Sequence, residues 1–136
     1  MSEYSKPIPA PSEDTVPFWA AAKEHQLKLQ KCDSCGAFRF PPGPVCPECT
    51  TLGGTWAKLS GKGKVHSFVV FHRAFHKAFE QDLPYAVALV ALDEGPRIIS
   101  IVVGIGPDKL RCDMPVEVIF EDVTADATLP KFKPVS

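Results

Sequence analysis

Four cysteines in two matched pairs constrain the fold of this chain more than any other feature. The pairs are Cys32-Asp33-Ser34-Cys35 and Cys46-Pro47-Glu48-Cys49, separated by ten residues. A CxxC turn places both sulfurs on one side, so two such turns can offer four thiolates at the corners of a tetrahedron, the geometry that Zn²⁺ adopts in structural sites. The pattern predicts one zinc ion bound by Cys32, Cys35, Cys46 and Cys49.

Other chemistries fit the cysteines less well. A disulfide framework would leave one of the five cysteines unpaired, and thioredoxin-like redox proteins use a single CxxC at the start of a helix. A single iron ion is the closer rival, because four thiolates also hold iron. A four-cysteine site has no open coordination position, so the metal is expected to be structural and to contribute about 10 to 16 kcal/mol to folding. Cys112 stands apart and is expected to pack as a small apolar side chain.

The segments around the pairs predict a zinc ribbon. Leu27 and Leu29 alternate with polar residues, which indicates a strand running into the first pair. Residues 55–59 can form the returning strand, and the Pro-rich segment 36–45 reads as a loop. Two hairpin turns that each present two thiolates to one ion are the order of a zinc ribbon.

The N-terminal segment predicts an extended arm followed by a short helix. The first fourteen residues hold three prolines and show no apolar periodicity. From Thr15, a candidate cap, the sequence favours a helix with Pro17 in its first turn. A helix this short is not stable alone, so Phe18 and Trp19 must dock either on the protein's own core or on a partner. At the end of the helix, His25 is expected to interact with the negative end of the helix dipole.

After residue 60 the composition is strongly β. Gly61 and Gly63 permit a sharp turn into this region, and residues 93–96 read as a hairpin turn. Four good strands are predicted at 64–72, 85–92, 97–103 and 116–120, with a weaker fifth at 129–135 that carries two prolines and is confined to an edge. Five strands without a helical period predict a small closed or nearly closed barrel such as an OB-fold.

The composition argues against nucleic acids and membranes as partners of this chain. Fifteen Lys and Arg against sixteen Asp and Glu give a net charge of −1, which argues against a dedicated nucleic-acid binder. No apolar run approaches the roughly 20 residues that span a bilayer, and no secretory signal pattern is seen in the first thirty residues. We therefore expect a soluble, cytoplasmic protein without a membrane role.

A catalytic centre is not predicted from the titratable residues. His66 and His72 share one strand at even spacing, which puts them on the same face, but about 20 Å separates residues six apart along a strand. Surface or barrel-mouth roles are expected for them. The long connection 73–83 carries Phe75 and Phe79, which could line a ligand groove or cap the barrel end.

Taken together, the motifs resemble the zinc-ribbon and OB-fold proteins associated with acyl-CoA metabolism. The resemblance covers nearly the whole chain and rests on Phe18-Trp19, Leu29 to Gly36, Phe40-Pro41-Pro42, Cys46 to Cys49, Ser60 to Gly63, Pro84-Tyr85 and Leu92 to Gly95. It implies a mainly β protein with an arm and docking helix (1–25), a rubredoxin-like zinc ribbon (26–59) and a C-terminal five-stranded OB-fold (60–136). One position departs from the family, because Gly43 stands where relatives often carry Arg.

The resemblance also implies a function. Such proteins are companions of thiolase-like enzymes, hydroxymethylglutaryl-CoA synthases, or hydratases and aldolases of sterol side-chain breakdown, and are thought to hold or channel the acyl-CoA. We expect a non-catalytic acyl-CoA-binding and scaffolding subunit rather than an enzyme. Coenzyme A carries phosphates, and the candidate groups to bind them are Arg73, Lys62 and Lys64. The alternatives are a single-stranded nucleic-acid-binding module, an independent enzyme and an iron electron carrier.

Overall fold

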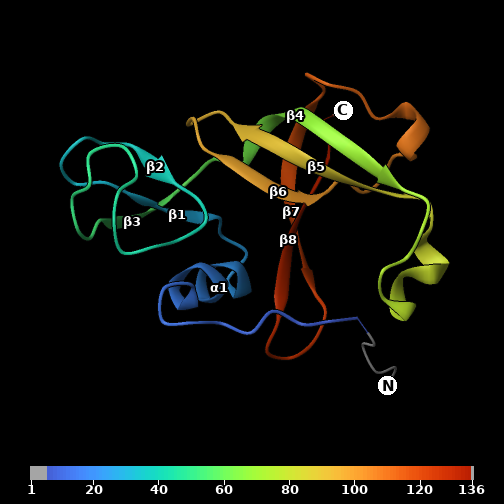
Figure 1. Ribbon diagram of the computed structural model, residues 1–136, viewed down its shortest axis with the longest axis horizontal. Coiled ribbons are helices and arrows are strands. Elements are labelled where there is room, and N and C mark those ends of the chain that lie inside the picture. Colours follow the sequence, from blue (N-terminus) through green and yellow to red (C-terminus); the bar gives the residue numbers. More distant parts are fainter. Residues whose placement is uncertain (1–5, 136) are drawn as a thin grey trace.

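The computed structural model describes residues 6–135, which form a small ribbon beside a larger barrel (Figure 1). The elements in chain order are α1 (Val16–Lys23), β1 (Lys28–Lys31), β2 (Phe38–Arg39), β3 (Thr55–Lys58), β4 (Lys62–Phe71), the 3-10 helix η1 (Lys77–Asp82), β5 (Tyr85–Leu92), β6 (Arg97–Ile101), the 3-10 helix η2 (Pro107–Lys109), β7 (Pro115–Asp122) and β8 (Thr128–Pro134). The mainly β fold with one N-terminal α-helix is as predicted. None of the helices in residues 6–135 is long and apolar enough to cross a membrane.

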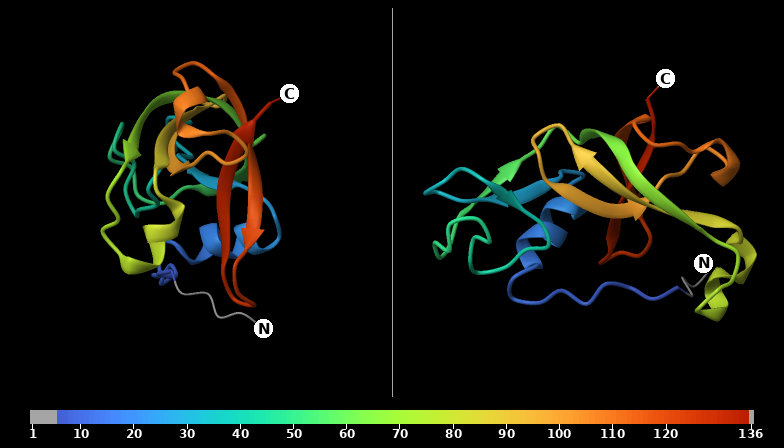
Figure 2. Two further views of the ribbon diagram at one scale, coloured as in Figure 1. Left: turned by 90° about the vertical axis from the view of Figure 1, so that its right-hand side faces the viewer. Right: turned by 45° about the horizontal axis from the view of Figure 1, so that its top comes forward.

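The N-terminal arm runs from α1 along the barrel to the opposite end of the molecule (Figures 1 and 2). There the Lys6 ammonium lies 2.5 Å from a carboxylate oxygen of Asp82 and over the ring of Phe79. Residues 1–5 of the predicted arm lie outside the described residues. The helix starts as predicted, but the Thr15 hydroxyl turns back to accept from the Ser12 N–H at 2.8 Å and makes no cap bond with the helix.

Helix α1 packs on the protein's own core. Phe18 is 4% exposed and belongs to the main cluster of buried apolar residues, and Trp19 packs against that cluster. The two rings meet edge to face with centroids 4.9 Å apart, and Phe40 from the ribbon lies 5.5 Å from Phe18. The sequence left open whether Phe18 docks on the protein's own core or on a partner. In the structure it packs on the protein's own core, where it contacts residues of the ribbon, the helix and the barrel.

The ribbon is a three-stranded antiparallel sheet in the order β2-β1-β3. Strands β1 and β3 lie where the sequence predicted them. The prediction of a plain loop at 36–45 is wrong in one respect, because Phe38 and Arg39 pair with Lys31 and Gln30 as strand β2. Two residues are too few to give a strand pattern in the sequence, and their pairing depends on the turn that the first cysteine pair makes.

The barrel is a five-stranded antiparallel sheet in the order β6-β5-β4-β7-β8. All five predicted strands are present, and β8 with its two prolines lies at an edge as predicted. The two edge strands, β6 and β8, approach each other but do not form a continuous ladder of backbone hydrogen bonds. A parallel bridge joins Val102 to Phe132, and the Ser100 hydroxyl donates to the Pro130 carbonyl at 2.7 Å. Because proline has no N–H, β8 cannot form a full ladder with β6 here.

A β-bulge in β4 changes which residues face the core. The register shifts between Val65 and Ser67, so that His66 has no partner in β5. Val65 is fully buried and Phe68, three residues later, also packs against the core. The prediction that His66 and His72 share a face is therefore wrong: the bulge reverses the alternation between them, and His72 follows the end of the strand.

The turn from the ribbon into the barrel requires glycine twice. Gly61 has φ +80°, and a Cβ there would lie 2.3 Å from a methyl carbon of Val118. A Cβ on Gly63 would lie 2.4 Å from the Ala91 carbonyl oxygen. Both positions allow β4 to pass closely over its neighbours at the sharp turn into the barrel that the sequence predicted.

Candidate metal centre

The four predicted ligand residues come together between the two turns of the ribbon. Their sulfur atoms all lie within 4.8 Å of one another, with Cys32 Sγ 3.5 Å from Cys49 Sγ and Cys35 Sγ 3.7 Å from Cys46 Sγ. Cys32 and Cys46 are buried, whereas Cys35 is exposed. The first cysteine of each pair is thus held in the interior, and the second is exposed at Cys35 and half-buried at Cys49.

The two turns have nearly the same backbone. In the first, the Gly36 N–H donates to the Cys32 carbonyl and the Cys32 N–H to the Ala37 carbonyl. In the second, Thr50 donates to Cys46 and Cys46 to Thr51 in the same way. The fourth residue after each leading cysteine has positive φ, +78° at Gly36 and +63° at Thr50. This conformation is easy for glycine and strained for threonine.

The donor set fits a tetrahedral, thiolate-binding metal such as zinc. Four soft sulfur ligands at mutual distances of this size match a closed site, and among residues 6–135 no carboxylate or imidazole belongs to the cluster. Nearby donors favour the thiolate form that a metal needs at two of the four cysteines, Cys49 and Cys32. The pKa of Cys49 is lowered to about 6, first by the Thr51 hydroxyl and then by the Thr51 N–H. The pKa of Cys32 is lowered by the N–H groups of Cys35 and Ser34.

Arg39 is a buried cation that sequence reasoning missed. Its side chain is 4% exposed. Nε donates at 3.1 Å to Gln30 Oε1 and to the Gly43 carbonyl, and Nη2 donates to the Gly53 carbonyl at 2.6 Å. The guanidinium therefore ties both loops of the ribbon to β1. Gly43 takes part through its backbone, which donates to Gln30 at 2.8 Å. An isolated Arg in a short segment gives no signal of such a role.

The predicted ligand-binding cations are not brought together. Lys62 and Lys64 are exposed at the start of β4, and Arg73 is exposed just after its end, with its guanidinium 5.6 Å from the Phe75 ring centroid. Ten residues of strand separate the two ends by about 33 Å. A compact ligand can reach only one of them, so their role stays a prediction.

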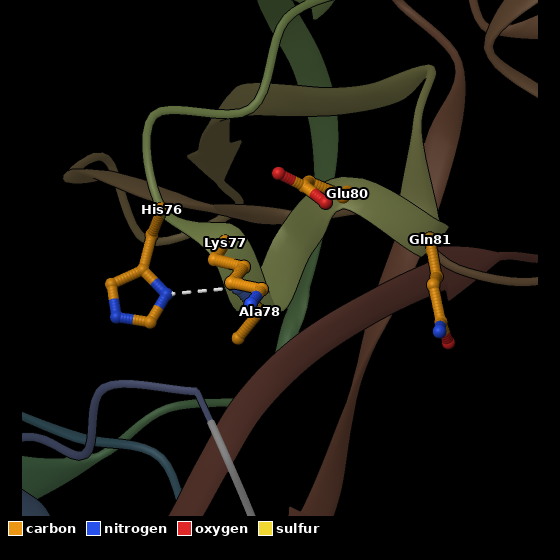
Figure 3. A pocket seen from close by; sticks show the side chains of 5 residues that line it. All are labelled: His76, Lys77, Ala78, Glu80 and Gln81. Atoms are coloured by element: carbon orange, nitrogen blue, oxygen red, sulfur yellow. Dashed lines mark hydrogen bonds between the residues drawn. The ribbon is translucent and has the colours of Figure 1, made fainter.

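The connection between β4 and β5 forms η1 at the far end of the barrel from the ribbon (Figure 1). Phe79 lies against Tyr85 with ring centroids 5.6 Å apart, while Phe75 is 75% exposed. A hollow of about 410 Å³ is lined by His76, Lys77, Ala78, Glu80 and Gln81. His76 Nδ1 accepts from the Ala78 N–H at 3.1 Å, and the Glu80 carboxylate lies apart from that ring (Figure 3). These groups do not converge on a common point.

Two single residues also differ from expectation. Cys112 is exposed rather than packed in the interior, because it lies in the turn after η2. His25 does more than face the helix end: its Nε2 lies 3.1 Å from a carboxylate oxygen of Asp122, and its ring stacks on Phe120. The Asp122 pKa is lowered first by the Thr128 hydroxyl and then by His25. This contact joins the helix end to β7.

Comparison with known proteins matches both the ribbon and the barrel to described protein families. Residues 19–51 match the family model described as "ChsH2, rubredoxin-like zinc ribbon domain", and residues 56–121 match "ChsH2, C-terminal OB-fold domain". A solved structure described as "Ltp2-ChsH2(DUF35) aldolase" is 41% identical, with a TM-score of 0.83 over 93% of this chain and 98% of that chain.

Two curated relatives differ in length. A "DUF35 domain-containing scaffold protein" of Methanocaldococcus jannaschii is 35% identical over 86% of this chain and 88% of its own. A "Probable enoyl-CoA hydratase alpha subunit" of Thermomonospora curvata is 41% identical over 95% of this chain. The present chain spans only 40% of the length of that hydratase subunit.

These relatives correct one prediction from the sequence. The chain was expected to be a non-catalytic accessory subunit of an acyl-CoA enzyme and not an enzyme itself. Several of its relatives are named as enzymes or enzyme subunits: the hydratase subunit of Thermomonospora curvata, a "3-oxo-4,17-pregnadiene-20-carboxyl-CoA hydratase alpha subunit" of Mycobacterium tuberculosis, and the aldolase. The classification as a non-enzyme is therefore wrong. Sequence reasoning failed here because it looked for a complete catalytic set within one chain, whereas a subunit can share an active site with others.

The family itself agrees with the resemblance drawn from the cysteine pairs and the barrel motifs. Both family models match in the order ribbon then barrel, and the Methanocaldococcus relative is similar over most of both chains. The chain belongs to the ChsH2-like DUF35 family, in which a rubredoxin-like zinc ribbon precedes an OB-fold domain.

Proposed function

We propose that this chain is a subunit of an enzyme that acts on acyl-CoA, of the hydratase or aldolase type. The observation that carries the proposal is the likeness to the chain of the solved aldolase, which extends over 98% of that chain at 41% identity. Two relatives are named as hydratase alpha subunits, and a relative in Thauera aromatica is named as a benzoylsuccinyl-CoA thiolase subunit. A thiolase-like partner is therefore the second choice within the same proposal.

The metal in this proposal is one zinc ion held by Cys32, Cys35, Cys46 and Cys49. The closeness of the four sulfurs and the match to a rubredoxin-like zinc ribbon support it. Four protein ligands leave no position for water or substrate, so the zinc would stabilise the ribbon rather than take part in the reaction. We also propose the division into 1–25, 26–59 and 60–136, since α1, the ribbon strands and the barrel strands fall within these three ranges.

The proposed ligand is the acyl-CoA itself. Arg73 is the favoured contact, because its exposed guanidinium lies over the exposed Phe75 ring, where a phosphate and a flat adenine could both be bound. Lys62 and Lys64 are the weaker candidates, at the other end of β4. Arg73→Ala should weaken acyl-CoA binding at least several-fold, and less so at high salt. Arg111→Ala, also exposed, is the matched control.

The function is tested by co-expressing the full chain with its cognate hydratase- or aldolase-type partner. The two polypeptides should purify as one complex, and the complex should act on acyl-CoA substrates. Calorimetry with acyl-CoA, on the chain alone and on the complex, locates the ligand site. Failure to form a complex would contradict the proposed function. A complex in which this chain does not bind acyl-CoA would contradict only the proposal that acyl-CoA is its ligand.

A further inference from the structure

The outward-facing residues of β4, β5 and β6 form cross-strand rows that are unusually apolar. The register aligns Ser67, Leu89 and Ile99 in one row, and Val69, Val87 and Ile101 in the next. Phe71 pairs with Tyr85 beyond them. We call six of these residues the outer apolar face: Val69, Phe71, Val87, Leu89, Ile99 and Ile101.

This face is only partly covered in the isolated chain, because two of its six residues are exposed and the other four are half-buried. Ile99 is 66% exposed and Val69 is 56% exposed, whereas the alternate residues of β5, such as Ala88 and Val90, are fully buried. A shallow hollow of about 180 Å³ lies at its centre, lined in part by Val69, Leu89 and Ile99. Strand β5 is therefore apolar on both faces, a pattern typical of strands that are covered on both sides. A contiguous apolar surface of this kind marks an interaction site.

The face continues toward the ribbon. Ile99 and Ile101 also line a groove of about 260 Å³ together with Trp19 and Phe40. The half-buried Trp19 is the type of residue that anchors protein interfaces. A partner that covers the strands would thus reach helix α1 as well.

Residues at the two ends of the face argue for one kind of occupant. Lys64, Ala91 and Arg97 form the next row at one end, and Arg73 follows β4 at the other. Of the acidic residues near these ends, Asp82 pairs with Lys6, and Glu94 accepts from the Ser60 N–H at 2.7 Å, which leaves Asp93 in the turn and Glu80 in η1. Two copies packed face to face would bring basic ends together in either strand orientation, which disfavours a second copy of this chain.

An oligonucleotide is also disfavoured, although the face of the second and third strands is where OB-folds bind nucleic acids. Bases bind there by stacking on aromatic rings. Here Val87, Leu89 and Ile99 take the central positions, and aliphatic side chains offer no such platform.

We propose that the outer apolar face is the docking surface for the partner subunit of the enzyme, and that the partner presents apolar side chains flanked by carboxylates that meet Lys64 and Arg97. This inference rests on the proposed function, in which the chain is one subunit of an enzyme with several. The central hollow would receive a single apolar anchor from the partner.

The test uses the full chain and its cognate partner enzyme subunit, with affinity measured by calorimetry or biosensor. Ile99→Glu and Val69→Glu should each weaken the complex by about 100-fold, because a charge would be buried in an apolar contact. Ile99→Ser is the milder second variant, with a loss of about tenfold. Arg97→Glu should weaken the complex at low salt and lose part of its effect in high salt.

Val135→Glu is the matched control, since Val135 is 45% exposed near the end of the chain and outside the face. Circular dichroism and metal content establish that each variant is folded. If the wild-type complex forms and the Ile99 and Val69 variants bind with unchanged affinity, the docking proposal is overturned while the proposed function stands.

Two further outcomes are also decisive. If the wild-type chain forms no complex, both the proposed function and the docking proposal fail. If sedimentation instead finds a dimer of this chain that Ile99→Glu separates, with partner binding unaffected, then a second copy occupies the face and the proposal is wrong.

Discussion

The ribbon and the barrel are stabilised by different means. The ribbon strands have only four, two and four residues, and Leu29 is its one fully buried aliphatic side chain among the described residues. The barrel strands run to ten residues and bury a cluster that includes Val65, Val90, Ile98 and Phe132. A segment that buries so little apolar surface cannot offset its loss of conformational entropy, so it depends on a metal and on polar contacts.

The largest expected effect is on the ribbon alone. Cys32→Ser should abolish metal binding, because it removes a buried member of the four-sulfur set, and should cost the ribbon about 10 kcal/mol or more of folding free energy. The barrel should stay folded. Elemental analysis measures the loss of metal, and the reactivity of the remaining thiols toward a thiol reagent measures the unfolding of the ribbon. Cys112→Ser, an exposed site outside the cluster, is the control. If Cys32→Ser still binds one metal ion per chain, Cys32 is not a ligand that the ribbon needs.

The barrel should respond most to Phe132→Ala. Phe132 is fully buried and contributes its backbone to the seam between β8 and β6. Removing the ring leaves a cavity in the core, with an expected loss of about 3 to 5 kcal/mol in the free energy of unfolding. Denaturant titration followed by circular dichroism and by the fluorescence of Trp19, which packs against this core, measures it. Phe75→Ala, at 75% exposure, should change stability by less than about 0.5 kcal/mol. Equal effects of the two changes would show that the core assignment is wrong.

Polar contacts within the ribbon should have an intermediate effect. Arg39→Ala removes three hydrogen bonds and leaves the carbonyls of Gly43 and Gly53 without this partner, at an expected cost of about 2 kcal/mol. The metal affinity should fall as well, since both loops would loosen. Arg39→Lys should recover only part of the loss, because Lys lacks the planar fork. If Arg39→Ala keeps the stability and metal affinity of the wild type, the polar contacts of Arg39 do not stabilise the ribbon.

The smallest expected effect lies where helix α1 meets β7. The lowered pKa of Asp122 contributes stability that is present above its unfolded value of about 3.9 and is lost as the pH falls through the folded value. Thr128→Val removes the larger cause, the hydroxyl that donates at 2.5 Å, and should raise the Asp122 pKa. His25→Ala should raise it less. Carboxyl titration by NMR measures both, and an Asp122 pKa unmoved by Thr128→Val would contradict this assignment.

Sequence alone was sufficient for features with local causes. The CxxC turns bring their own pair of sulfurs together, and β5 and the turn after it follow from a run of strand-forming apolar residues and from turn residues within a few positions. For the same reason Gly61 and Gly63 could be assigned to a sharp turn into the barrel. Family membership followed from the order of these local motifs along the chain.

The tertiary structure decided what depends on residues far apart in the chain. Asp122 lies 97 residues from His25, and no pattern around either residue predicts their contact. The buried role of Arg39 requires two loops and strand β1 to converge, and the bulge at His66 appears only when β4 is laid against β5. The outer apolar face belongs to the same class. Its residues read as ordinary strand formers in the sequence, and only the register of three strands shows that they share one exposed surface.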